Sequence, residues 1–261
     1  MWLALLLLTS ARALDLSGVA ALVDKTIGPV GQDYCVATLI ETSDRPDAPA
    51  YLVGCAHCPF FFRDPSTIIV GRKLALDARF DPPGAKPFWA KLVELSWGTM
   101  GGTDAAVFRL EQTVGQLRAA GIRPLRLART PVRPGELMVR AQTPAETYSC
   151  PVVAAGVRLK EERYYYDDSY KYGCSTRHGA SGSPLIRADT GELFGVHNSG
   201  RPTKPGCGLD NVCELDEYNR AKPPDFTVSY GQPVHGLAGC FRADGIFDLS
   251  LPDCRPPGRR R

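Results

Sequence analysis

The stretch His178-Gly179-Ala180-Ser181-Gly182-Ser183-Pro184-Leu185 holds a serine closely flanked by glycines and followed by a Ser-Pro pair. Glycine lets a backbone turn tightly and approach another molecule closely, so this serine is expected at an exposed turn. A serine hydroxyl is a poor nucleophile at neutral pH and reacts only when an adjacent base takes its proton. A base, and a group that orients it, must therefore lie elsewhere in the sequence.

Two upstream motifs contain such partners. His57 lies in Val53-Gly54-Cys55-Ala56-His57-Cys58, and Asp104 begins Asp104-Ala105-Ala106-Val107-Phe108-Arg109-Leu110. An imidazole accepts and returns a proton near pH 7, and a carboxylate holds it in the required tautomer. Each motif alone is a weak signal. Together, the order His57, Asp104, Ser181 predicts a catalytic triad, with the N–H groups of Gly179 and Ser181 as the oxyanion hole.

Composition sets the broad class. The 261 residues suffice for one two-lobed domain or two small ones, and 44% hydrophobic residues suit a globular core. The net charge of +3 is too balanced to favour a nucleic-acid partner. The run Arg259-Arg260-Arg261 follows two prolines and is interpreted as a solvated tail. A protein or peptide substrate and a monomer are the expectations.

The N-terminus has the character of an export signal. Residues 1–13 combine a short apolar run with small residues at Ala11 and Ala13, and are predicted to be a signal peptide. The alternative is a buried N-terminal helix, because no Lys or Arg precedes the apolar run. No other stretch approaches membrane-spanning length, so the mature protein is expected to be soluble and secreted or periplasmic.

Nine cysteines in an exported chain indicate disulfides, and the odd number leaves one thiol over. Sequence alone does not fix connectivity. The expected scheme leaves Cys55 unpaired and joins Cys35–Cys58, Cys150–Cys174, Cys207–Cys213 and Cys240–Cys254. Cys55-Ala56-His57-Cys58 by itself is a poor zinc site, so neither a metal nor a cofactor is expected.

The chain has little helical periodicity. Short runs of β-branched and aromatic residues alternate with Gly, Pro and Asp turns, which predicts an all-β fold. Strands are expected at 34–40, 50–54, 67–70, 105–110, 136–141, 151–159, 183–186 and 192–197. The proline-containing segment 124–134 is interpreted as a linker between two lobes.

The linker sets the expected domain organisation. The first lobe is 14–123, with His57 and Asp104, and the second is 124–200, with Ser181. Residues 201–261 form a cysteine-containing extension that completes the second lobe or packs on it. This division predicts an active site in the cleft between the lobes.

Residues 158–172 interleave charged residues with five tyrosines. Two interpretations are open. The segment is either a loop beside the cleft that contacts substrate or a solvent-exposed hairpin with tyrosines packed across its strands. The hairpin is preferred.

The three motifs resemble those of the trypsin/chymotrypsin-like serine proteases over about residues 30 to 200. The resemblance implies two antiparallel six-stranded β-barrels, an acyl-enzyme mechanism and an active site between the barrels. Ala180 departs from the animal enzymes, which carry at that position an Asp that pairs with a newly cut N-terminus. The chain also lacks an Ile-Val-Gly-Gly activation site, so activation by that route is not expected.

The form Gly-x-Ser-Gly-Ser-Pro is more similar to the bacterial glutamyl endopeptidase branch. In that branch a Thr five residues before the serine and a His in a Gly-Ile-His-type motif line the primary pocket. Thr176 and His197 occupy those places here, with His178 expected at the pocket lip. A hydroxyl and an imidazole can hydrogen-bond a carboxylate, so cleavage after Glu or Asp is implied. The alternatives are a structural His197 and a solvated His178.

Two function classes remain. The favoured one is a secreted serine endopeptidase. The other is a catalytically inactive protease homologue acting as a secreted binding module, which the departures at Ala180 and Cys55 keep open. An α/β-hydrolase fits poorly, since that fold requires the order Ser, Asp, His and alternating β and α segments.

Overall fold

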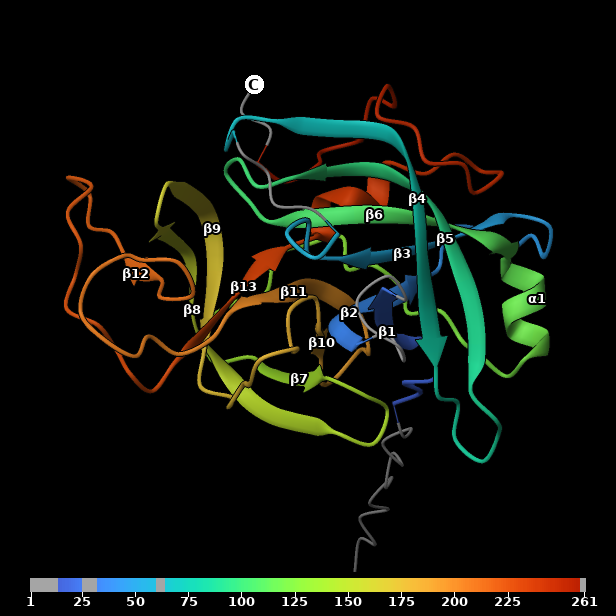
Figure 1. Ribbon diagram of the computed structural model, residues 1–261, viewed down its shortest axis with the longest axis horizontal. Helices are drawn as coiled ribbons and strands as arrows, with labels where there is room; N and C mark the ends of the chain where they lie inside the picture. The colour runs from blue at the N-terminus through green and yellow to red at the C-terminus, as the bar shows by residue number, and fades with distance from the viewer. Residues whose placement is uncertain (1–13, 25–31, 60–63, 259–261) are drawn as a thin grey trace, which may run out of the picture.

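The computed structural model describes residues 14–24, 32–59 and 64–258. The predicted signal peptide and the arginine tail lie outside these residues. Across the described ranges the chain is built of β-strands with one short α-helix and one 3-10 helix (Figure 1). Among these residues, no helix has the length and apolar character needed to cross a membrane.

The first lobe is a closed six-stranded antiparallel barrel. Its order is β1-β2-β3-β6-β5-β4, so the first and last strands pair and no edge is left open. Apolar side chains that alternate along the strands fill the interior, among them Leu39, Leu52 and Phe108. The strands are β1 Val19–Asp24, β2 Gln32–Ile40, β3 Pro49–Gly54, β4 Ile68–Phe80, β5 Phe88–Thr99 and β6 Ala105–Thr113.

A short helix follows the last strand of the first lobe. Strand β6 ends at Thr113, whose side chain accepts from the Gln116 amide, while the Gln116 side chain accepts from the Thr113 amide. This capping box starts α1, Val114–Ala119, which buries Val114 and Leu117. The linker then runs toward the second lobe, where Ala128 donates to Leu193.

The second lobe is a seven-stranded antiparallel sheet in the order β12-β8-β7-β10-β11-β13-β9. An additional β8–β9 pairing joins the ends, so six of these strands form a ring with β12 at its edge. The predicted class, an all-β double barrel with a disulfide-stapled C-terminal extension, is confirmed. The strands are β7 Leu137–Ala141, β8 Thr147–Glu161, β9 Tyr164–Tyr172, β10 Pro184–Arg187, β11 Leu193–Ser199, β12 Cys213–Glu214 and β13 Ser229–Pro233.

The tyrosine-rich segment forms the β8–β9 hairpin. Tyr164, Tyr166, Tyr170 and Tyr172 are buried, and Tyr165 is exposed. The segment is therefore a hairpin as preferred, but the expected solvent exposure is wrong, because four of its five tyrosines are buried. The other interpretation also has support, because Tyr164 and Tyr166 border the cavity that contains Ser181.

Residues beyond 200 contribute to both lobes. Strands β12 and β13 belong to the second sheet, and the 3-10 helix η1, His235–Gly239, follows β13. The chain then returns to the first lobe, where Phe241 and Phe247 pack on Tyr51. The segment after β13 is thus a second connection between the two lobes, in addition to the linker.

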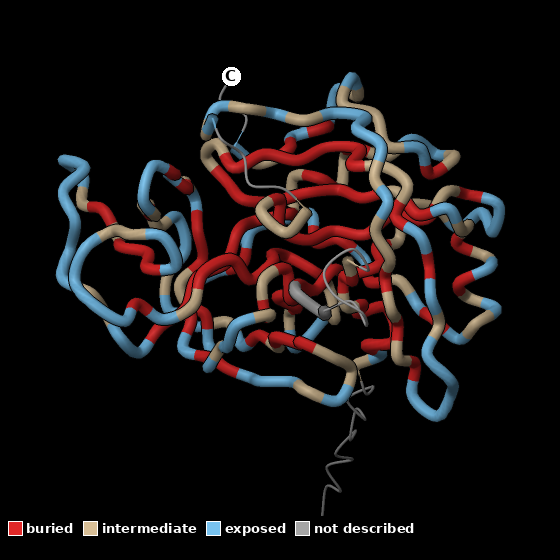
Figure 2. The backbone as a smooth tube through the Cα atoms, viewed as in Figure 1, coloured by how far each residue is buried: buried red, intermediate tan, exposed pale blue. Residues whose placement is uncertain are grey.

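The lobes share a buried apolar cluster. It contains Val53 and Val107 from the first barrel with Ile186 and Val196 from the second sheet. Figure 2 shows the buried backbone concentrated at the centre, with exposed segments at the periphery. A continuous core of this kind gives the cleft residues of the two lobes a fixed mutual geometry.

Four disulfides staple the chain: Cys35–Cys58, Cys150–Cys174, Cys207–Cys213 and Cys240–Cys254. These are the four pairs expected from the sequence. Cys55 is a buried free thiol.

Candidate active site

His57 and Asp104 form a tightly oriented pair. His57 lies in the turn after β3, and Asp104 immediately precedes β6, which pairs with β3. The Nδ1 atom of His57 is 2.5 Å from Oδ2 of Asp104. The other oxygen, Oδ1, accepts from the amides of Ala56, at 2.7 Å, and His57, at 3.0 Å. Asp104 is fully buried while the His57 side chain is 24% exposed, so the imidazole opens toward solvent.

The electrostatics of His57 suit a base. Burial of the ring disfavours its charged form, but the Asp104 carboxylate outweighs this and raises the pKa of His57 above its ordinary value. The hydrogen bond to Asp104 acts in the same direction. The carboxylate thus stabilises the imidazolium that forms when His57 takes a proton.

Asn198, which the sequence analysis did not identify, also holds Asp104. Its Nδ2 donates to Asp104 Oδ2 at 2.5 Å, and its Oδ1 accepts from Ser199 Oγ at 2.5 Å. Both residues lie at the end of β11. The adjacency of Asn198 to His197 in the sequence was the signal that could have identified it.

The turn that contains Ser181 depends on the two glycines beside it. Gly179 and Gly182 have φ angles of +83° and +82°. A Cβ on Gly182 would stand 1.9 Å from the carbonyl oxygen of Val36. The turn is tied to both lobes, because the Ser181 carbonyl accepts from the Val36 amide and the Gly182 amide donates to the His197 carbonyl.

A cavity of about 370 Å³ brings most of the predicted residues together. His57, Thr176, His178, Gly179, Ser181 and His197 line it, and Asp104 lies buried behind His57. Within the described ranges no hydrogen bond joins Ser181 to His57. Such bonds are commonly long before substrate binds. A larger hollow, bordered by Tyr170 and His235, contains none of the triad residues.

His197 is buried in the wall of this cavity and is 3% exposed. Its Nδ1 lies 2.6 Å from the Tyr172 hydroxyl and 3.1 Å from the Tyr230 carbonyl oxygen. Burial, reinforced by the charge of Arg140, lowers the pKa of His197 to about 3. The ring is therefore neutral at physiological pH. Thr176 lies nearby, with Oγ1 3.2 Å from Ser229 Oγ, and His178 is exposed at the rim.

Arg140, in β7, is a second residue that sequence analysis missed. The residue is only 1% exposed. It donates to the carbonyl of Ser175 at 3.0 Å and stacks on the Tyr148 ring, with 4.6 Å to the ring centroid. Its Nε has no hydrogen-bond partner, and no described carboxylate forms an ion pair with it. Ser175 directly precedes Thr176, so this charge lies just behind the cavity wall.

Cys55 packs between the turn that contains Ser181 and β11. Its Sγ lies 3.0 Å from the His197 carbonyl oxygen, and burial raises the pKa of its thiol well above the ordinary value. Since the thiolate is the reactive form, we expect iodoacetamide to leave the native protein unmodified at about pH 8. After denaturation without reductant, mass spectrometry should find one alkylated cysteine, Cys55. Rapid labelling of the native protein would show that the thiol is accessible.

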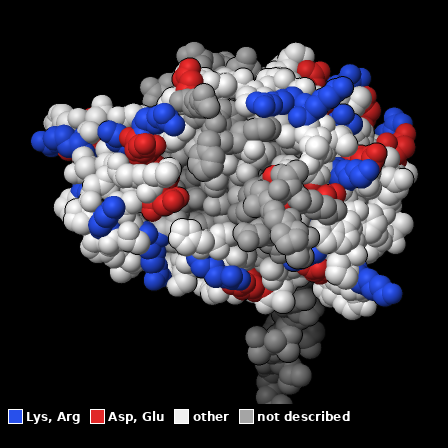
Figure 3. All heavy atoms as spheres, in the orientation of Figure 1, with Lys and Arg blue, Asp and Glu red and all other residues white. Residues whose placement is uncertain are grey.

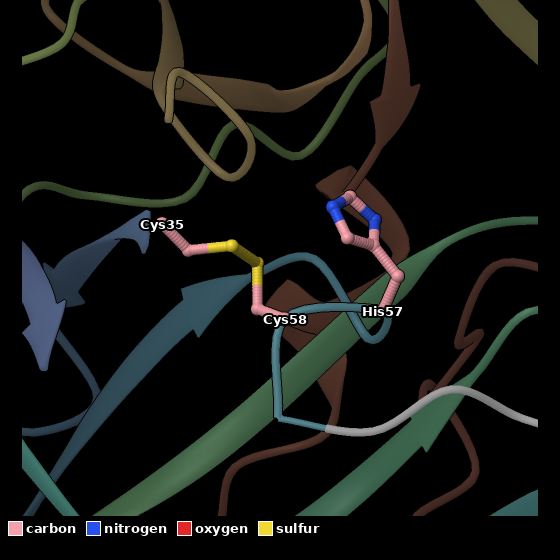
Figure 4. Close-up of side chains that lie close together, drawn as sticks. All are labelled: Cys35, His57 and Cys58. Atoms are coloured by element: carbon pink, nitrogen blue, oxygen red, sulfur yellow. A yellow bond between two sulfur atoms is a disulfide. The ribbon is translucent and has the colours of Figure 1, made fainter. Parts of the chain in front are cut away.

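The Cys35–Cys58 disulfide lies beside the His57 ring, as Figure 4 shows. The three side chains have the mutual spacing of metal donors. Both sulfur atoms are, however, bonded to each other and are not available as thiolates. The bridge instead fixes the turn that carries His57 to strand β2.

The fold and this constellation define a protein of the trypsin-like class. The chain belongs to the trypsin-like peptidase domain family, whose model matches residues 39–196. No curated protein sequence matches the chain.

Among solved structures, the chain is similar to the MamO protease domain from Magnetospirillum magneticum, with 13% identity and a TM-score of 0.52 over 85% of this chain and 94% of that one. It is also similar to the Rv3671c protease from M. tuberculosis in an inactive form, with 16% identity and a TM-score of 0.47 over 86% and 87% of the two chains. At these identities the first likeness supports the fold alone.

Proposed function

We propose that the protein is an exported serine endopeptidase. The observation that carries the proposal is the His57–Asp104 pair opening onto the cavity that also contains Ser181 in its glycine turn. Disulfides persist in oxidising compartments, which supports secretion or a periplasmic location. Figure 3 shows acidic and basic side chains interspersed on one face of the molecule.

The proposed reaction has two halves. Ser181 Oγ attacks the peptide carbonyl carbon while His57 Nε2 takes its proton, and the oxygen of the tetrahedral intermediate accepts from the amides of Gly179 and Ser181. The C–N bond then breaks, and His57 gives its proton to the leaving amine. In the second half His57 takes a proton from water, whose oxygen attacks the acyl-enzyme carbonyl carbon; the bond to Ser181 Oγ then breaks as His57 gives that proton to Oγ. Among the described residues neither amide of the proposed oxyanion hole has another acceptor.

We further propose a preference for Glu or Asp before the scissile bond, as in the glutamyl endopeptidase branch. Nδ1 of neutral His197 faces two partners: a proton on Nδ1 would go to the Tyr230 carbonyl and leave Nε2 as an acceptor, whereas a Tyr172 hydroxyl that donates to Nδ1 leaves the ring proton on Nε2. The proposed preference uses the second tautomer, in which Nε2 donates to a carboxylate. Thr176 supplies a hydroxyl on the same cavity. Arg140 supplies a buried positive charge behind Ser175 without a carboxylate partner of its own.

The charge of Arg140 gives a direct prediction. Two matched peptides, with Glu or its neutral isostere Gln before the scissile bond, should differ in kcat/KM in favour of Glu. Arg140→Met should lower the Glu-to-Gln ratio about tenfold or more, because a charge near a desolvated carboxylate is weakly screened. Arg140→Lys keeps the charge and should restore much of the ratio. An unchanged Glu-to-Gln ratio in folded Arg140→Met would show that Arg140 does not contribute to the preference for Glu.

Digestion of a peptide library by the mature protein, with Ser181→Ala as control, tests activity and specificity together. Cleavage after Glu or Asp that is absent in the control supports both parts of the proposal. Cleavage only after Arg, Lys or bulky apolar residues rejects the acidic preference alone. No cleavage by correctly oxidised protein favours the inactive homologue.

A further inference from the structure

Glu161 is a carboxylate on the active-site cavity that the proposed chemistry does not use. It is the last residue of β8 and borders the cavity together with His57 and Ser181. Its Oε1 accepts from the Asp210 amide at 2.9 Å, and its Oε2, 3.1 Å from Ser199 Oγ, shares the single hydroxyl hydrogen of that serine with Asn198 Oδ1. These two bonds fix the group at the end of the β8–β9 hairpin.

Among the described residues, His57 is the basic group whose charge acts on the Glu161 carboxylate. Within the described parts of the chain, no Lys or Arg forms an ion pair with Glu161. The two arginines that border the same cavity are directed elsewhere: Arg177 pairs with Glu146, and Arg201 points to the Gly173 carbonyl. Burial raises the pKa of Glu161, which means that its charged form is poorly solvated. A ligand cation would stabilise that charge.

The surroundings suit a long basic side chain. Tyr164, Tyr166 and Met100 border the cavity beside Glu161, and Leu209 and Val212 border it from the segment before β12. Lysine and arginine pack their aliphatic stems on such surfaces while the charged head reaches a polar partner. Aromatic rings add a favourable interaction with a nearby cation.

We propose that Glu161 forms a second specificity subsite, which binds a Lys or Arg side chain of the substrate close to the residue in the primary pocket. This inference rests on the proposed endopeptidase function. It gives the substrate class a pattern: an acidic residue before the scissile bond and a basic residue near it. The two subsites carry opposite charges. The positive charge of Arg140 lies behind the wall of the primary pocket, and the negative charge of Glu161 lies on another wall of the cavity.

A lysine scan tests the subsite. The residue before the scissile bond is held at the one that library digestion selects, and each neighbouring position carries either Lys or its uncharged analogue norleucine. At one position, kcat/KM should favour Lys about tenfold or more, and Glu161→Gln should bring that ratio close to one. Asp210→Asn, which removes another carboxylate bordering the cavity, is the matched control and should keep the preference.

Peptide binding to the Ser181→Ala variant keeps the test independent of catalysis. Fluorescence polarisation with the same Lys and norleucine peptides should show tighter binding of the Lys peptide, lost when Glu161→Gln is added. Ratios near one at every position contradict the subsite, even if the peptides are cleaved. Loss of the preference in Asp210→Asn but not in Glu161→Gln also overturns the assignment. Absence of cleavage with a Glu161-dependent binding preference rejects the endopeptidase and keeps the subsite.

Discussion

Replacing Ser181 by alanine should lower kcat for a good peptide substrate about a millionfold, to a residual rate set by the remaining site. The variant keeps the oxyanion amides and His57 but has no atom that can form the acyl-enzyme. The fold should be intact, because the Ser181 side chain makes no hydrogen bond among the described residues and the turn depends on Gly182. Initial rates under saturating substrate measure the loss.

The control for Ser181→Ala is its thermal unfolding curve and its disulfide map, which should match those of the wild type. A folded variant that retains more than about one per cent of the wild-type kcat would contradict the nucleophile assignment, since losses from this group are far larger in serine proteases.

Replacing Asp104 by asparagine should lower kcat about 10,000-fold while leaving the backbone geometry near His57 largely intact. Oδ2 of Asp104 holds Nδ1 of His57, which keeps Nε2 as the proton acceptor for Ser181. An asparagine can present an N–H to the ring and stabilise the wrong tautomer. It also removes the charge that stabilises the imidazolium.

The pH profile separates these effects from simple unfolding. The reaction requires neutral His57, so kcat/KM falls as the pH drops through the pKa of that residue. Because the Asp104 carboxylate raises this pKa, the acidic limb should move to lower pH in Asp104→Asn, at a much lower plateau. Asn198→Ala is the matched comparison, since it removes a donor to Asp104 but leaves the charge. An acidic limb unchanged in folded Asp104→Asn would contradict the pairing.

The strands that could be predicted from the sequence are short runs made up mostly of apolar residues. Those at 50–54 and 105–110 lie in β3 and β6, and nearly all the residues in these two ranges are buried. The sequence predicts a strand only at 67–70, but β4 runs to Phe80, because all but two of its residues are exposed or half-buried and give no clean alternation. Strand β13, with Gly231, Gln232 and Pro233, has low β-propensity and forms through pairing with β11 and β9.

The site was predictable where short motifs carry it. His57, Asp104 and Ser181 each lie in a recognisable local pattern. Arg140, Glu161 and Asn198 gain their roles from contacts between distant segments, such as Asn198 with Asp104, 94 residues apart. The charge of Arg140 inside the apolar run Leu137–Ala141 was the one local hint of a buried cation. Its position behind Ser175 depends on the sheet and could not be read from spacing.

The most direct test of the central claim is labelling with a fluorophosphonate, which reacts with an activated serine hydroxyl and not with an ordinary one. The mature wild-type protein should incorporate about one label per molecule, and peptide mapping should place it on Ser181. Prior denaturation should abolish the reaction, because the activation depends on the folded His57–Asp104 pair. Correctly oxidised, folded protein that takes up no label, or takes it up at another residue, would contradict the account.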